Sequence, residues 1–216
     1  WIRWTNIERF ADQHDFAVVM FSAGNSDYYA WPDAALGYDP YRFLLDELMP
    51  LAQQWFPLST KREENFVAGL SMGGYGACLY GFNNPERFGG VGAFSGVPFD
   101  LPNLLKDPSQ LPDRMQNHIK ATGGLDAYLA SPLNVWQKTR DYAEALERGD
   151  IEKPMQLYLS CGDKDDLMYE PFKTYKAYLE DLGLEATYEV GKGYAHEWDF
   201  WEISFKSMVK AFGLTK

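Results

Sequence analysis

The residues with the clearest chemical potential lie in Gly69-Leu70-Ser71-Met72-Gly73, which fits the pattern G-x-S-x-G. A short, mostly apolar segment, residues 65–70, precedes the serine, and residues 75–82 can continue as a helix. This context predicts a sharp strand-to-helix turn that lifts the Ser71 hydroxyl clear of a sheet. The backbone N–H of Met72 would then lie at a helix N-terminus and face an oxyanion developing on an attacked carbonyl. The pattern predicts a nucleophilic serine, and a glycine-rich turn with a chance serine is the alternative.

A nucleophilic serine needs a general base, and the chain holds three histidines. His14 ends the first predicted helix among polar residues, and His118 lies in a loop-rich segment with no acidic motif beside it. We interpret both as structural or solvated. His196 follows the last predicted strand in a glycine-containing loop, at the strand end where open α/β sheets place their sites. His196 is therefore the predicted base.

The acid that orients the base is expected in the turn after the preceding predicted strand. That turn contains three aspartates, Asp163, Asp165 and Asp166. Each could instead be a loop residue or a helix cap, so the turn alone leaves the choice among them open. The resulting order along the chain, serine then aspartate then histidine, is the order found in α/β-hydrolases.

Segments with strand and helix patterns alternate along the chain, which predicts a doubly wound, mostly parallel sheet with helices on both faces. Asp39 is expected to cap a helix that starts at Pro40 and kinks at Pro50. Residues 96–133 are rich in Pro and Gly, and we interpret them as a cap-like excursion of a single domain, residues 1–216. The predicted strands span residues 16–21, 65–70, 90–95, 155–161 and 185–190, and the predicted helices span 1–11, 40–55, 75–82, 114–120, 135–148, 170–182 and 198–212.

Composition narrows the classes of partner. The net charge of −11 disfavours nucleic acid and anionic membranes, which would require a basic face. Only two cysteines occur, Cys78 and Cys161, so neither a disulfide framework nor a zinc site is expected. We expect no metal and no organic cofactor. No run of 18 apolar residues and no signal peptide is visible, which favours a cytoplasmic location. The many aromatic residues are compatible with a homo-oligomer.

Several further stretches, spread over nearly the whole chain, match one group of proteins. They are residues 3–9, 37–39, 60–63, 69–76, 161–165 and 196–201. On these stretches the chain resembles small acyl esterases of the tributyrin esterase type, in the group that contains esterase D (S-formylglutathione hydrolase) and feruloyl esterases. The resemblance implies the α/β-hydrolase fold. It also implies that Asp165 is the acid of the triad, with Asp163 and Asp166 as alternatives because this chain has more than one acidic residue there.

The same resemblance predicts that part of the fold is supplied from elsewhere. The family carries a His-Gly motif after its third strand, where the second oxyanion donor arises, and this chain has no such motif. By resemblance the chain begins inside the first helix, so roughly three strands are absent. One of them would lie beside the elbow strand, and its loss would leave backbone hydrogen bonds open. We therefore expect a bound N-terminal segment of the same protein, or a partner chain, to complete the sheet.

The predicted function is a serine hydrolase that cleaves small-molecule carboxylic esters with short acyl chains. Ser71 would attack, His196 would move the proton, and Asp165 would orient His196. The short-chain preference rests on the resemblance. Phe99 and Trp198 are candidates for the acyl pocket, with core packing as the alternative for Trp198.

The sequence is also compatible with other roles and reactions. Tyr28 is a candidate for contact with the leaving group, with a plain surface loop as the alternative. Alternative reactions are those of an S-formylglutathione hydrolase-like thioesterase, an acetyl or feruloyl esterase on plant polysaccharide, and an acyltransferase. A catalytically incompetent binding module that retains the elbow is the alternative from another class.

Overall fold

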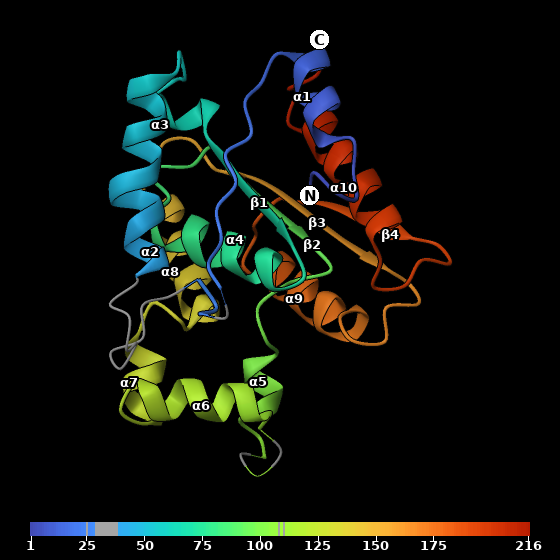
Figure 1. Cartoon of the computed structure of the whole chain (residues 1–216). Coiled ribbons are helices and arrows are strands. Elements are labelled where there is room, and N and C mark those ends of the chain that lie inside the picture. Colours follow the sequence, from blue (N-terminus) through green and yellow to red (C-terminus); the bar gives the residue numbers. More distant parts are fainter. Residues whose placement is uncertain (25, 29–38, 108, 110) are drawn as a thin grey trace.

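The computed structural model describes residues 1–24, 26–28, 39–107, 109 and 111–216. Within these residues four parallel strands form one sheet in the order β1-β2-β3-β4 (Figure 1). The strands are β1 (Phe66–Leu70), β2 (Gly90–Phe94), β3 (Gln156–Gly162) and β4 (Thr187–Gly191). Because all four run in the same direction, their carboxyl ends meet at one edge of the sheet. The predicted α/β class is confirmed.

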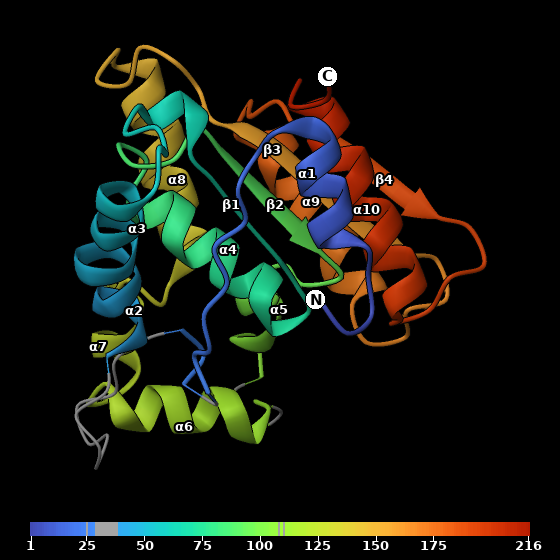
Figure 2. The same cartoon turned by 45° about the horizontal axis from the view of Figure 1, so that its top comes forward.

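Helices cover both faces of the sheet (Figures 1 and 2). Alternate residues of β2 separate the two cores, because Ala93 packs with the helices of one face while Phe94 packs with those of the other. One face holds α4 (Met72–Asn83), α8 (Val135–Glu147) and α9 (Tyr169–Asp181), and the other holds α1 (Ile7–His14) and α10 (Trp198–Ala211). This two-sided burial is the reason why β2 is apolar along its whole length, and all of its residues are buried.

The predicted excursion follows the carboxyl end of β2 and contains short helices. They are α5 (Leu101–Leu104), α6 (Asp113–Ala121) and α7 (Leu125–Ala130), and α6 and α7 lie at the lower end of the molecule in both views (Figures 1 and 2). The predicted helix over 114–120 is thus confirmed as α6.

The helical stretch before β1 begins as expected. The Asp39 carboxylate accepts a hydrogen bond from the Arg42 N–H at 2.9 Å, and Pro40 occupies the first turn. The expected disturbance at Pro50 takes the form of a π-helical segment just before it, because proline cannot donate to the preceding turn. The elements are α2 (Pro40–Arg42), η1 (Phe43–Leu48) and α3 (Met49–Trp55), followed by the 3-10 turn η2 (Arg62–Glu64).

Two predictions for the N-terminal region are wrong. Residues 16–21 form no strand, and Val19 and Met20 are exposed, each with 46% of its surface accessible. An apolar run becomes a strand only where a neighbouring backbone pairs with it, and no described strand does so here. The first helix starts at Ile7 instead of at residue 1, because the Trp1 carbonyl closes a turn by accepting from the N–H of Thr5 at 3.0 Å.

The elbow strand β1 lies at an edge of the described sheet. The Ser71 N–H donates to the Phe94 carbonyl at 2.8 Å, and the Asn65 carbonyl accepts from the Gly89 N–H at 2.7 Å. Since successive residues of a strand direct their polar groups to opposite sides, the N–H and C=O of Ala68 and Leu70 face the other edge. Among the described residues no strand lies there, and the Ala68 side chain is exposed. An edge of this kind can accept a further strand.

Candidate active site

The candidate nucleophile lies on the turn between β1 and α4. Ser71 has φ 51° and ψ −121°, a region that costs a non-glycine residue energy and is typical of the nucleophile elbow. The turn also requires glycine at Gly69, because a Cβ there would lie 2.2 Å from the carbonyl oxygen of Gly73. The sequence pattern and the backbone geometry therefore agree at this turn.

His196 reaches the serine from the loop that follows β4. Its Nε2 lies 2.8 Å from the Ser71 Oγ, and the edge of its ring packs against Trp201 with 4.8 Å between ring centroids. The loop is held from the neighbouring turn, because the Asp163 carboxylate accepts from the Gly193 N–H at 2.7 Å. This position allows the imidazole to exchange a proton with the serine hydroxyl.

Asp165 is the aspartate that contacts His196. The Asp165 Oδ2 lies 2.8 Å from the His196 Nδ1, and the Asp165 side chain is fully buried. The other oxygen, Oδ1, accepts from the N–H groups of Leu167 at 3.2 Å and Met168 at 3.0 Å. These two bonds fix the plane of the carboxylate. Asp163 instead holds the histidine loop, and Asp166 is exposed.

Met72 is the first residue of α4, immediately after the candidate nucleophile. The first N–H groups of a helix have no partner within the helix and carry the positive end of its dipole. The Met72 N–H therefore lies at the positive end of the α4 dipole, directly after Ser71.

The three predicted substrate contacts lie in different surroundings. Tyr28 packs on the glycine face of α4, since a Cβ on Gly76 would lie 2.5 Å from its ring and one on Gly73 would lie 3.3 Å from its hydroxyl. Phe99 is half-buried and packs against Tyr75, one helical turn from Ser71. These two side chains flank the first turns of the nucleophile helix.

Trp198 instead packs in an aromatic cluster near the N-terminus. Its ring lies 5.7 Å from that of Trp1, 6.4 Å from that of Trp4 and 5.3 Å from that of Trp201. This packing fits the alternative weighed for Trp198, that of a structural residue. Trp201 is the member of the cluster that touches His196.

A buried charged cluster beside Tyr28 is missed by the sequence analysis. Asp27 is 5% exposed and contacts both Arg114 and His118 of α6, with 2.9 Å from the Arg114 Nε to its Oδ2. Burial, and then the charge of Arg114, lower the pKa of His118 to about 4. The sequence gives no signal for this cluster, because 87 residues separate Asp27 from Arg114.

Among the described residues no group of three or more His, Cys, Asp or Glu side chains could hold a metal ion. No helix in the described part of the chain is long and apolar enough to cross a membrane.

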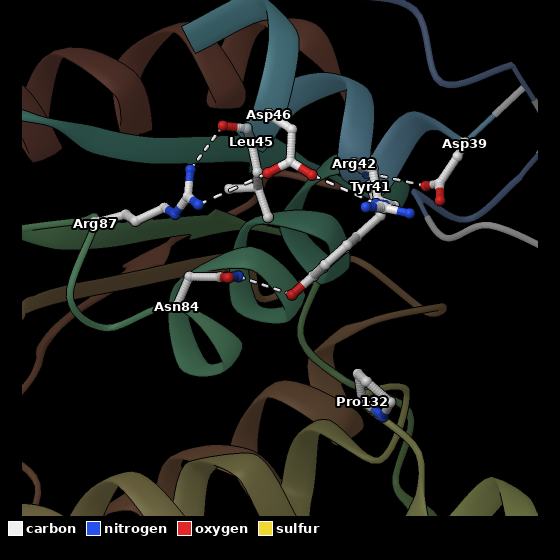
Figure 3. A pocket seen from close by; sticks show the side chains of 8 residues that line it. All are labelled: Asp39, Tyr41, Arg42, Leu45, Asp46, Asn84, Arg87 and Pro132. Atoms are coloured by element: carbon white, nitrogen blue, oxygen red, sulfur yellow. Dashed lines mark hydrogen bonds and ion pairs between the residues drawn. The ribbon is translucent and has the colours of Figure 1, made fainter. Parts of the chain in front are cut away.

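A pocket of about 340 Å³ lies beside the C-terminal end of α4, near Asn84 and Arg87 (Figure 3). It is remote from Ser71, because α4 spans 12 residues, about 18 Å. Its two arginines, Arg42 and Arg87, both turn toward Asp46, so the pocket offers little free positive charge to a ligand (Figure 3).

Comparisons with known proteins agree with this geometry. An acetyl esterase from Caldicellulosiruptor saccharolyticus is 27% identical over 203 residues, 93% of this chain and 73% of that protein. Among solved structures, FphF, a fluorophosphonate-binding serine hydrolase of Staphylococcus aureus, superposes with a TM-score of 0.75 at 27% identity, covering 100% of this chain and 78% of that one. The S-formylglutathione hydrolase FrmB of Staphylococcus aureus gives a TM-score of 0.72 at 27% identity, covering 98% and 77%. These neighbours are serine hydrolases of the α/β-hydrolase fold. Residues 5–212 match the family model described as "Putative esterase", and the chain therefore belongs to this esterase family as a carboxylic ester hydrolase.

Proposed function

We propose that the protein hydrolyses carboxylic esters with short acyl chains through a Ser71–His196–Asp165 triad. One observation carries the proposal: two hydrogen bonds of 2.8 Å join the three side chains in line, Ser71 Oγ to His196 Nε2 and His196 Nδ1 to Asp165 Oδ2. The residue types and the order of contacts are those that activate a serine hydroxyl. The likeness to an acetyl esterase supports a small acyl group.

The chemistry follows from these positions. Ser71 Oγ forms a bond to the ester carbonyl carbon while His196 Nε2 takes the hydroxyl proton. The Met72 N–H stabilises the negative charge on the former carbonyl oxygen. Collapse of this intermediate breaks the bond to the alcohol, which leaves with the proton from His196. Water then repeats the sequence on the acyl-enzyme and frees Ser71. Asp165 keeps the imidazole in the required tautomer throughout.

We also propose that Tyr28 and Phe99 contact the substrate. Tyr28 and Phe99 both pack on the first turns of α4, which supports a place for them in the wall around the reacting ester. The tributyrin-esterase type is supported by the resemblance of the sequence motifs. The main alternative is a thioesterase, which the likeness to FrmB favours. Parallel assays with a short-chain ester and with S-formylglutathione, compared by kcat/KM, separate the two.

We also propose that a further extended segment, of the same protein or of a partner, pairs with the open edge of β1. The outward N–H and C=O groups of Ala68 and Leu70 support it, as does the exposure of Ala68 in a parallel sheet, a kind normally covered on both faces. Such a segment would also be placed to bring a second oxyanion donor to Ser71. Loss of one donor typically slows acyl transfer by about 100- to 1,000-fold.

The test of the function is labelling with a fluorophosphonate probe together with an ester series of increasing acyl length. We expect one adduct at Ser71 and a kcat/KM that is highest for acetyl to butyryl esters. Ser71→Ala should abolish labelling and lower kcat by at least about 10⁴-fold, because the nucleophile is lost. Activity that persists in Ser71→Ala, or an adduct at another residue, would overturn the proposed function.

A further inference from the structure

The carboxylate that holds the candidate base has one donor that the triad description leaves out. The Cys161 thiol lies 3.8 Å from the Asp165 Oδ2, with the sulfur as donor. This is the same oxygen that accepts from the His196 Nδ1. Cys161 lies near the end of β3, four residues before Asp165, and is fully buried. The thiol therefore acts on the oxygen that faces the imidazole.

A buried serine also influences the Cys161 thiol. Ser95, which is 1% exposed, follows β2, and its hydroxyl opposes the rise in the pKa of the Cys161 thiol that burial and the charge of Asp165 cause. The Ser95 Oγ is buried without a hydrogen-bond partner among the described residues. Ser95 also has a positive φ of 44°, a strained conformation for a non-glycine residue, and it precedes Gly96, whose close packing on the Ser71 carbonyl leaves no room for a Cβ. The backbone conformation at Ser95 is thus constrained by the packing of the next residue.

The protonation state of the thiol suits a donor. Burial, and then the negative charge of Asp165, raise the pKa of Cys161 to about 12, so the group is an S–H at any pH at which the enzyme would be assayed. The other charged groups near the acid face elsewhere. Asp163 accepts from Gly193, Glu197 accepts from Ala195, and Asp166 is exposed. From the side of α10, the ring of Trp201 packs on His196.

We propose that Cys161, supported by Ser95, is a positioning residue for the reaction: its thiol donates to Asp165 and thereby sets how strongly this carboxylate holds the protonated His196. The inference rests on the proposed function. A carboxylate that loses a donor attracts the imidazolium proton more strongly. The histidine then stays protonated, and inactive as a base, up to a higher pH. The thiol takes no part in bond making or breaking.

The test is the pH profile of kcat/KM for a short-chain ester in the complete protein. Cys161→Ala should move the acidic limb upward by about half a pH unit, a modest shift because a thiol is a weak donor. Cys161→Ser, which restores a donor, should bring the limb back to the wild-type position or below it. Ser95→Ala should give a smaller upward shift, since it acts only through the thiol.

Cys78 supplies the matched control. It is the other buried cysteine, 1% exposed on α4, and the pKa of its thiol is likewise raised to about 12 by burial. Cys78→Ala therefore removes a similar volume from the interior without touching Asp165, and its acidic limb should stay in place. An unmoved limb in Cys161→Ala, an equal shift in Cys78→Ala, or a failure of serine to restore the limb would each overturn the inference while the proposed function stands. Activity that survives Ser71→Ala would instead overturn both.

Discussion

At the level of single residues, the three aspartates after β3 make different contacts. Asp165 is buried against His196, Asp163 accepts from the Gly193 N–H of the histidine loop, and Asp166 faces solvent. We predict that Asp165→Asn lowers kcat by about 10⁴-fold, because an amide cannot hold the imidazole in the required tautomer. Asp166→Asn, the neighbouring control, should retain full activity. Steady-state kinetics on a short-chain ester decides the assignment, and a large loss in Asp166→Asn alone would transfer the role to that residue.

At the level of elements, the cluster of Asp27, Arg114 and His118 joins the N-terminal segment before α2 to α6 of the excursion. His118 is only 4% exposed, and burial, then the charge of Arg114, lower its pKa to about 4 from an ordinary value near 6.5. Between pH 4 and pH 6.5, therefore, His118 binds a proton in the unfolded chain but not in the folded protein. The contribution of neutral His118 to the free energy of unfolding is complete above about pH 6.5 and is lost as the pH falls toward 4.

We accordingly predict that His118→Gln flattens the pH dependence of unfolding. Between pH 7 and pH 5 the wild-type free energy of unfolding should fall by up to about 2 kcal/mol more than that of the variant. Urea denaturation at the two pH values measures the difference, and His14→Gln, on the first helix, serves as the control. A wild-type protein that is instead relatively more stable at pH 5 would show that the attraction of Asp27 for a protonated His118 outweighs its burial.

At the level of the whole molecule, one edge of β1 pairs with no other strand among the described residues. A parallel strand with one free edge exchanges its outward amide hydrogens easily, whereas a central strand is protected. We predict that, in the isolated 216-residue chain, the amide hydrogens of Ala68 and Leu70 exchange faster than those at the centre of β2 and β3. Hydrogen exchange resolved by residue tests this. Slow exchange at both positions would mean that the edge is already covered, for instance by a second copy of the chain in a homo-oligomer built on this edge.

The same measurement on the protein with a completing segment tests the proposal for that edge. Pairing should protect Ala68 and Leu70 and raise kcat together, because both effects follow from one added strand and the donor that it carries. The β4 residues at the opposite edge of the sheet should not change, and they provide the internal control.

Much of this protein can be predicted from local sequence patterns. The glycines around Ser71 specify a turn that side chains would block, and this requirement is visible in five residues. His196 and the aspartate group follow predicted strands, and in a parallel sheet the carboxyl ends of the strands meet at one edge, so their meeting is predictable without coordinates. The cap at Asp39 is likewise set by its neighbours in sequence.

Tertiary structure decides whatever depends on groups distant in sequence. Residues 16–21 have the composition of a strand but pair with no described strand, since pairing depends on a neighbour that composition cannot supply. The contact of Asp27 with His118 spans 91 residues. The choice of Asp165 over its neighbours depends on which carboxylate the turn buries against the imidazole, and the thiol of Cys161 meets that carboxylate only because β3 ends beside it. Local patterns fix which chemical groups are present and at which edge, whereas burial and distance, properties of the packed chain, fix which of them act on one another.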